Sequence, residues 1–403
     1  MVKKIALCLL FLMLFPMQIN AANTVKVSFI RQGNLWVYDN GTERQLSYAR
    51  HASMPQWSSH GDIVAYAEND SLMIAPLKGK PLLVEHDVTH YQWSPVAEEL
   101  AYISNGILVY YNVKTHEKKR VAVGVDQFSW FPEGDRFLIT SAAALAPTGW
   151  GPVKLYTVSK YAGLDVKKVE AFTTLPAEND SFFAYTTSSF KWSPNGQWIS
   201  FIAIPTASMS ADANKLCIIT KEGKAFQVVG DMLNVPNWFK WSNEEQVLAF
   251  IDGEGRFATE NKKFTLKEMP VFKEHVFTPK GFADWDFTWT EKDNIIISRV
   301  PEAGWSNDEK KRPLPFLYSM DVKTNKQSQF TFPQKGLGDY APVYHKATNQ
   351  TMWIRTNRKQ ANLLTRVKDT KNDKVLISGL DLPGNYYELY RWNEVFSVYN
   401  LNS

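Results

Sequence analysis

The chain has 403 residues, of which 44% are hydrophobic and 14% are aromatic, and its formal net charge is +4 at pH 7. This length and hydrophobic content suit one large all-β unit or two smaller domains, and they exclude a disordered chain. No segment concentrates Lys and Arg between aromatic residues, so nucleic acid is not an expected partner.

The first segment has the pattern of a secretory signal peptide. Lys3 and Lys4 precede an apolar run over residues 5–15, and residues 20–22 are small enough for cleavage. Because the apolar run is short for a bilayer span, we expect residues 1–22 to be removed and no membrane span to remain. The mature protein is therefore predicted to be secreted or extracytoplasmic, in a bacterial cell envelope or periplasm.

After cleavage, Cys217 would be the only cysteine of the mature chain. A single cysteine cannot form an internal disulfide, and its apolar neighbours predict a buried strand residue. An exported protein without disulfides suits a bacterial route better than the eukaryotic one.

The rest of the chain repeats one motif, in which an aromatic residue, any residue and Trp-Ser precede a turn and an apolar strand. FKWSPNGQWISFIA at Phe190 and FKWSNEEQVLAFID at Phe239 are two copies. The distance between copies ranges from 36 residues (Trp57 to Trp93) to 62 residues (Trp130 to Trp192). A strand-based repeat of this length predicts a β-propeller. The copies begin near Trp57, Trp93, Trp130, Trp192, Trp241, Trp289 and Tyr344.

The strands of the repeat are apolar on both faces, as in IVAYA, LAYIS and WISFIAI. A single four-stranded sheet would leave one such face in water, whereas sheets stacked radially cover each other. We therefore predict an all-β fold in which residues 23–403 form one β-propeller of four-stranded antiparallel blades. The tryptophan that ends each first strand is interpreted as a structural residue packed between blades.

The two ends of the mature chain complement each other. VSFIRQGNLWVYDNGTERQL reads as the second, third and fourth strands of a blade, and YYELYRWNEVFSVYN supplies a first strand. Pairing these terminal strands would close the ring and remove its exposed sheet edges. Seven internal copies and one composite blade make eight blades. Seven blades are the alternative, because both ends offer a candidate second strand.

The copies FKWSPNGQWISFIA and YQWSPVAEELAYIS, together with IRQGNLWVYDNGTERQL, resemble the WD-like repeats of the TolB family. These repeats are related to the propellers of prolyl-oligopeptidase-type peptidases. The resemblance covers nearly all of the mature chain and implies the propeller fold. TolB itself has an α/β domain before its propeller, whereas this sequence enters its first blade directly after the predicted signal peptide.

Function is expected where the copies differ from one another. The connection between the second and third strands is long at residues 143–152, 205–214 and 301–314. The first and last of these inserts contain a Gly-Trp pair, at Trp150 and Trp305. Since strands alternate in direction within a blade, these inserts and the connections between blades should lie on one face of the disc.

The predicted function is a non-catalytic, monomeric scaffold that binds an envelope or extracellular protein, peptide or glycan through this loop-rich face. Long segments before the fourth and sixth copies add further aromatic and acidic residues to the same face. Aromatic residues are frequent binding anchors, so we predict that the binding residues are Trp150, Trp305, Trp285, Tyr185 and Asp286. The other interpretation is that the inserts only cap the disc and that the protein is a purely structural component of the envelope.

Motifs for chemistry are few in the sequence. The GxSxG motif of the hydrolase domain that accompanies peptidase propellers does not occur, and no glycine-rich phosphate loop follows a strand. We therefore predict no catalytic residue, no cofactor and no metal. The alternative function is a carbohydrate-active enzyme, a lyase or hydrolase, with its site in the central funnel. Three or more His, Asp or Glu side chains converging near the axis would indicate it.

Overall fold

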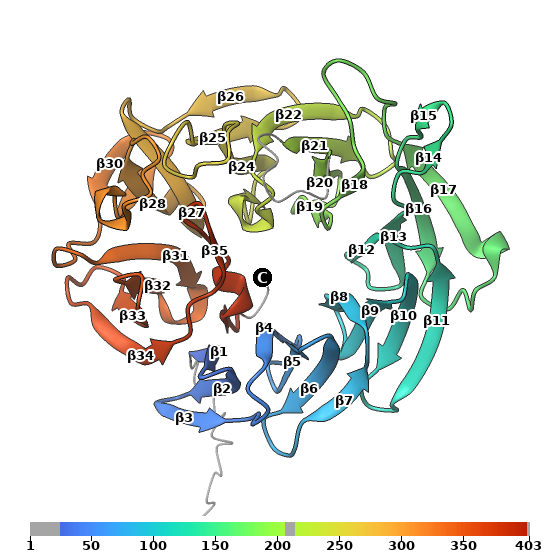
Figure 1. The fold of residues 1–403 in the computed structure, drawn as a ribbon, viewed down its shortest axis with the longest axis horizontal. Coiled ribbons are helices and arrows are strands. Elements are labelled where there is room, and N and C mark those ends of the chain that lie inside the picture. Colours follow the sequence, from blue (N-terminus) through green and yellow to red (C-terminus); the bar gives the residue numbers. More distant parts are fainter. Residues whose placement is uncertain (1–24, 206–213, 401–403) are drawn as a thin grey trace, which may run out of the picture.

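The computed structural model describes residues 25–205 and 214–400, which form eight antiparallel sheets around one axis (Figure 1). In each sheet the strands follow one another outward from the axis. The innermost strand of the fifth sheet is broken into two pieces, and both pieces pair with the next strand. The described chain is thus an eight-bladed β-propeller. This confirms the all-β fold and the eight blades, and the seven-blade alternative is wrong.

The first four blades are given from the axis outward. Blade 1 contains β37 (Phe396–Val398), β1 (Lys26–Arg31), β2 (Asn34–Asp39) and β3 (Thr42–Gln45). Blade 2 contains β4 (Ala52–Trp57), β5 (Ile63–Glu68), β6 (Ser71–Pro76) and β7 (Leu82–Glu85). Blade 3 contains β8 (Val88–Trp93), β9 (Glu99–Ser104), β10 (Ile107–Asn112) and β11 (Glu117–Val123). Blade 4 contains β12 (Gln127–Trp130), β13 (Arg136–Thr140), β16 (Lys154–Ser159) and β17 (Val169–Thr174).

The other four blades follow the same order. Blade 5 contains β18 (Thr186–Thr187), β19 (Lys191–Trp192), β20 (Trp198–Ile204), β21 (Asn214–Thr220) and β22 (Gln227–Met232). Blade 6 contains β23 (Phe239–Trp241), β24 (Val247–Asp252), β25 (Lys263–Glu268) and β26 (Lys273–Val276). Blade 7 contains β27 (Phe282–Glu291), β28 (Asn294–Pro301), β29 (Phe316–Asp321) and β30 (Lys326–Gln329). Blade 8 contains β31 (Gly338–His345), β32 (Gln350–Thr356), β33 (Ala361–Val367) and β34 (Lys374–Leu380).

Two short hairpins and several 3-10 helices stand outside these sheets. One hairpin pairs β14 (Leu145–Ala146) with β15 (Gly149–Trp150), and the other pairs β35 (Asn385–Tyr386) with β36 (Leu389–Tyr390). The 3-10 helices are η1 (Val166–Lys168), η2 (Pro236–Trp238), η3 (Glu309–Lys311), η4 (Lys346–Thr348) and η5 (Trp392–Glu394). Within residues 25–205 and 214–400, none of these helices has the length and apolar character needed to cross a membrane.

Both faces of the middle strands are buried, as the apolar runs predicted. In β5, the four consecutive residues from Val64 to Ala67 are all buried, although their side chains alternate between the two faces. Burying one large apolar side chain contributes roughly 1.5–3 kcal/mol. A blade therefore gains much of its stability from contact with the blades on either side of it.

The chain termini meet in blade 1. Strand β37 pairs with β1 in an antiparallel register that sets Phe29 opposite Phe396 and Val27 opposite Val398. The N–H of Ile30 also donates to the carbonyl of Val395 at 2.8 Å. The predicted closure by terminal strands is thus confirmed. Each of the two strands pairs its facing edge with the other, so the ring has no open sheet edge at this point.

The repeated tryptophans join neighbouring blades. Five of them donate the indole N–H to a carbonyl on the innermost strand of the preceding blade, at 3.0–3.2 Å. Each such hydrogen bond contributes about 0.5–1.5 kcal/mol, so the ring is held near its axis by a repeated contact. The structural interpretation of these tryptophans is confirmed. The five are Trp57, Trp93, Trp130, Trp192 and Trp241.

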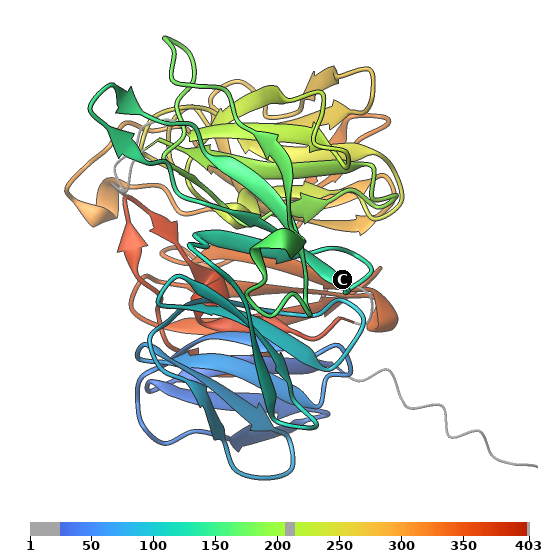
Figure 2. The ribbon, with the colours of Figure 1, turned by 90° about the vertical axis from the view of Figure 1, so that its right-hand side faces the viewer.

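One face of the disc carries the long excursions of the chain. Figure 2 shows the β14–β15 hairpin, η3 and the β35–β36 hairpin projecting to the left of the sheets. The first two belong to the inserts at 143–152 and 301–314, which the sequence placed on one face. Most of the third insert, residues 206–213, and the predicted signal peptide lie outside the described residues.

Candidate functional site

Two adjoining cavities lie at the axis of the propeller and together form what we call the funnel. Their volumes are about 490 and 450 Å³, which is in the range of small-ligand sites. Both are lined by Asn234, Val235, Arg391 and Glu394. These four residues therefore stand where the first cavity meets the second.

The funnel walls come from segments that interrupt the blade pattern. One is the connection from blade 5 to blade 6, where Pro236 begins η2 and leaves Asn234 and Asn237 exposed. The other is the segment 384–398, which follows the last complete blade and runs into the centre of the ring (Figure 1). Proline has no N–H to donate to a sheet, so its position favours this irregular turn at the axis.

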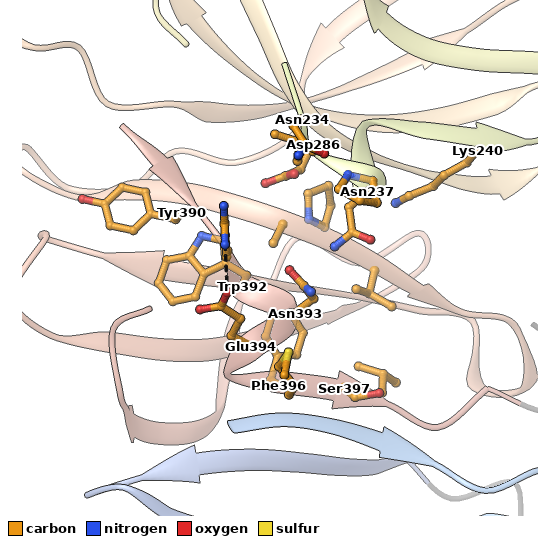
Figure 3. A pocket seen from close by; sticks show the side chains of 18 residues that line it. Asn234, Asn237, Lys240, Asp286, Tyr390, Trp392, Asn393, Glu394, Phe396 and Ser397 are labelled. Carbon is orange, nitrogen blue, oxygen red and sulfur yellow. Dashed lines mark ion pairs between the residues drawn. The ribbon is translucent and has the colours of Figure 1, made fainter. Parts of the chain in front are cut away.

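Asp286 and Lys240 both line the first cavity (Figure 3). Asp286 Oδ1 accepts a hydrogen bond from Trp238 Nε1 at 2.9 Å, and Lys240 Nζ donates to the carbonyl of Phe287 at 2.5 Å. Burial raises the pKa of Asp286, against the opposing effect of the Lys240 charge. Burial lowers the pKa of Lys240 to about 8, and Asp286 opposes that change. A charged ligand would compensate this loss of hydration.

A loose ion pair lies between the two cavities. Arg391 Nη1 and Glu394 Oε1 are 3.6 Å apart, and the two side chains are 49% and 30% exposed. A pair with this exposure contributes little to stability, typically about 0–1 kcal/mol. A ligand ammonium or carboxylate can therefore replace either partner at low cost.

Aromatic side chains form the apolar wall of the first cavity. The rings of Tyr390 and Trp392 are stacked with centroids 5.5 Å apart, and Phe396 lies beside them in the lining. In Figure 3 this wall faces Asn234, Asn237 and the other polar groups. The cavity thus offers an apolar surface on one side and hydrogen-bonding groups on the other.

The second cavity is lined partly by blade 5 and partly by the β35–β36 hairpin. Tyr185 and Thr186 approach from blade 5, and Tyr386 and Leu389 approach from the hairpin. The Thr186 hydroxyl donates to Asp126, while burial raises the pKa of that carboxyl group. This cavity is less charged than the first, and it suits an uncharged or aromatic portion of a ligand.

A serine and a histidine from different blades are in contact. Ser189 Oγ and His90 Nε2 are 3.1 Å apart, and the imidazole packs edge-on against Phe128. Burial lowers the pKa of His90 to about 4, so the ring is neutral at pH 7. Within the described residues no carboxylate is hydrogen bonded to the other ring nitrogen. The pair therefore lacks the third group that orients the imidazole in a catalytic triad.

Replacing His90 with Gln should make the free energy of unfolding less dependent on pH between pH 4 and pH 6.5. Between pH 6.5 and pH 4 the unfolded imidazole is protonated and the buried one is not, so stability falls as the pH is lowered. This difference of one proton is worth no more than about 1.4 kcal/mol per pH unit. Urea unfolding at several pH values measures the slope. The exposed His51, replaced with Gln, is the control, and equal slopes in the two variants would contradict the assignment.

The residues that the sequence predicted as binding residues are dispersed in the structure. Asp286 lines the first cavity and Tyr185 lines the second. Trp150 is 37% exposed and packs edge-on against Tyr185, with centroids 5.4 Å apart. Trp305 stacks on Phe257 at 5.2 Å, in another part of the loop-rich face. The five residues therefore do not form one surface.

Trp285 requires a correction. Its side chain is only 2% exposed, and its indole N–H donates to the carbonyl of Ala258 at 2.6 Å. It also packs against Tyr340, with ring centroids 5.6 Å apart. Trp285 is a core residue, and a partner at the surface would not reach its ring.

Lys240, Arg391, Glu394 and the asparagines of the funnel were not predicted from the sequence. One signal was present. Between the aromatic residue and the tryptophan of the motif, most copies have Gln, Ser or Thr, whereas two consecutive copies have Lys191 and Lys240. A charge at this axis-facing position of two neighbouring blades points to the funnel. Within residues 25–205 and 214–400, no three His, Cys, Asp or Glu side chains lie together in a way that could hold a metal ion.

Comparison with known proteins identifies the fold. No protein-family model matches the chain, and no curated protein matches it. A solved puromycin hydrolase mutant matches 82% of this chain and 54% of its own length, with a TM-score of 0.53 and 9% identity. A puromycin-hydrolysing peptidase of Mycobacterium tuberculosis matches 83% of this chain and 55% of its own, with a TM-score of 0.52 and 12% identity. The chain thus spans about half the length of these enzymes, and the likeness is one of fold.

This finding corrects the function predicted from the sequence. A non-catalytic scaffold that binds through its loop-rich face was expected, but the solved structures that the propeller resembles are a puromycin hydrolase and a puromycin-hydrolysing peptidase. The physical reason for the error lies in the loops. Trp150 packs against Tyr185 and Trp305 against Phe257, whereas charged and amide groups line the funnel.

Proposed function

We propose that the propeller binds short peptides in its funnel and contributes this binding to a peptide-hydrolysing activity. The observation that carries the proposal is the chemistry of the funnel, which presents acids, cations and side-chain amides around an apolar wall. A short peptide has an ammonium group at one end, a carboxylate at the other, and amides between them. The likeness of the fold to two puromycin-hydrolysing enzymes supports the same class of ligand.

Each part of a peptide has a counterpart in the funnel. Asp286 and Glu394 suit the ammonium group, and Lys240 and Arg391 suit the carboxylate. Asn234, Asn237 and Asn393 can pair with peptide amides. Hydrogen bonds between charged groups are about twice as strong as neutral ones, so the charged ends should dominate affinity.

Arg391→Gln should weaken binding of a free tripeptide by roughly ten- to a hundredfold, because a charge-assisted hydrogen bond is worth about 1.5–3 kcal/mol. The same substitution should have a smaller effect on a C-terminally amidated tripeptide, which lacks the carboxylate. Isothermal titration calorimetry with the free, N-acetylated and amidated peptides measures these differences. Mass spectrometry of the same mixtures shows whether the peptides are cleaved.

Arg44→Gln is the matched control, because Arg44 is an exposed arginine on the outermost strand of blade 1. It should leave all three affinities unchanged. The proposal fails if the unmodified tripeptide does not bind at millimolar concentration, or if Arg391→Gln affects the free and amidated peptides equally.

Two further assignments rest on the sequence alone and are kept as proposals. The first 22 residues support export to the cell envelope or beyond, and the repeats support membership of the TolB-like propellers. Both are compatible with a peptide-binding protein that acts outside the cytoplasm.

A further inference from the structure

The β35–β36 hairpin lies over the funnel on the loop-rich side of the disc (Figures 1 and 2). Its residues Asn385, Tyr386 and Leu389 line the second cavity. The chain then continues directly into η5, with Arg391 as its N-cap and Glu394 as its last residue. The position of this hairpin therefore sets both the roof of the second cavity and the pair of charges between the cavities.

The turn of the hairpin does not favour its own conformation. Tyr387 and Glu388 have φ angles of 52° and 68°, in the left-handed region. Two-residue hairpin turns of this kind prefer Asn and Gly, which adopt positive φ at little cost. A Tyr-Glu turn is strained in this conformation, so other contacts must hold it in place.

Glu388 supplies one of these contacts. Its side chain is fully buried between two guanidinium groups, with Arg312 Nε at 3.0 Å from Oε1 and Arg358 Nε at 3.3 Å from Oε2. Arg312 belongs to the insert at 301–314, and Arg358 belongs to the connection between β32 and β33. One carboxylate thus ties the hairpin to blades 7 and 8.

Tyr387 supplies a second contact of a different kind. Its ring packs edge-on against Trp305 and Phe257, with centroids 4.9 and 5.0 Å away. Arg312 lies over the ring of Trp305 at 4.8 Å, so the aromatic contact and the ion pair share the same insert. The two residues with strained φ angles are therefore also the two whose side chains anchor the hairpin.

We infer that Glu388 is a positioning residue that latches the β35–β36 hairpin over the funnel, and that release of this latch opens the second cavity. A buried carboxylate between two arginines resists release, whereas the strained turn favours it. The hairpin therefore has a closed state that depends on one side chain. This inference depends on the proposed function only for the identity of the ligand, a peptide that would enter the second cavity past the hairpin.

Hydrogen–deuterium exchange of the full chain tests the latch without any ligand. Glu388→Gln keeps the shape of the side chain and removes its charge, and it should raise amide exchange in residues 384–391 by roughly tenfold or more. Arg358→Gln should raise exchange in the same residues by a smaller factor, because Arg312 still pairs with Glu388. The double variant should add little to Glu388→Gln alone, because that change already removes both ion pairs.

Tyr387→Ala is the second variant, since it removes the aromatic contact and leaves the ion pair intact. It too should raise exchange in 384–391, by a smaller factor than Glu388→Gln. Glu178→Gln, at an exposed acid in the segment between blades 4 and 5, should change nothing. Unchanged exchange in the hairpin of Glu388→Gln would overturn the inference, and so would an equal increase in all eight blades.

Stopped-flow binding of the free tripeptide provides a separate measurement. If the hairpin limits entry, Glu388→Gln should associate faster than the unmodified protein, and Glu178→Gln should not. An increase in exchange without a change in association rate would overturn the role in entry. A tripeptide that fails to bind the unmodified protein would count against the proposed function, while the exchange result would still decide whether the latch exists.

Discussion

Replacing Asp284 with Asn is expected to lower the free energy of unfolding by about 3–5 kcal/mol. Asp284 is 0% exposed and Arg299 is 3% exposed. The guanidinium donates to both carboxylate oxygens, at 2.5 and 2.8 Å, and the Thr278 hydroxyl donates to the same carboxylate at 2.6 Å. The substitution removes the negative charge and leaves the arginine buried without its counterion, which is the costly part.

Urea unfolding followed by circular dichroism measures this loss. Asp135→Asn makes the same chemical change in an exposed pair, where Arg136 Nε lies 3.9 Å from the carboxylate. Its effect should stay within about 0.5 kcal/mol. Replacing both Asp284 and Arg299 with Leu and Met should recover most of the stability, because a buried pair exchanged for apolar residues is often neutral. A loss below about 1 kcal/mol in Asp284→Asn would contradict the buried pair.

Replacing Phe396 with Ala is expected to lower the free energy of unfolding by about 3–5 kcal/mol, the usual cost of removing a buried phenylalanine. Phe396 is 6% exposed and stands on β37, opposite Phe29 of β1. The cavity would form where the chain ends close the ring. Its effect should therefore reach both blade 1 and the funnel, whose first cavity Phe396 lines.

The matched control for this substitution is Phe332→Ala. Phe332 is 73% exposed, so the same truncation creates no cavity there and should change stability by less than about 0.5 kcal/mol. Thermal and urea unfolding of the two variants measure the difference. Equal stability in Phe396→Ala and Phe332→Ala would show that the terminal strand does not close the propeller.

The fold was predictable because the information for one blade is local. Each copy of the motif contains its own strands, its turn and the tryptophan that joins it to the preceding blade. The incomplete blades at the two ends of the chain predicted that the two ends pair with each other, since neither can bury its surface alone. Counting copies therefore predicted eight blades, with seven as the alternative because both ends offer a candidate second strand.

The site was only partly predictable, because it combines residues that are far apart in the chain. Lys240 and Arg391 are separated by 151 residues, from 240 to 391, yet both line the first cavity. The aromatic residues of the loop-rich face could not be assigned from the sequence, since an exposed aromatic residue and a packed one have the same sequence signature. Trp150 packs against Tyr185, and Trp305 against Phe257.

The neighbours Trp285 and Asp286 show why orientation escaped the sequence. The register of β27 against β28 shifts between Asp284 and Phe287, which marks a β-bulge. A bulge inserts a residue and changes which side chains point to each face of the strand. Trp285 enters the core while Asp286 lines the funnel.

The amino-acid sequence by itself determined the propeller fold and its closure by the terminal strands, because every blade repeats the same short-range pattern of apolar strands and turns. The structure then decided for eight blades rather than seven. Only the tertiary structure decided where chemistry can occur. The funnel and its latched hairpin arise from side chains of several blades that meet at the axis, and no local pattern records which distant residues will face one another.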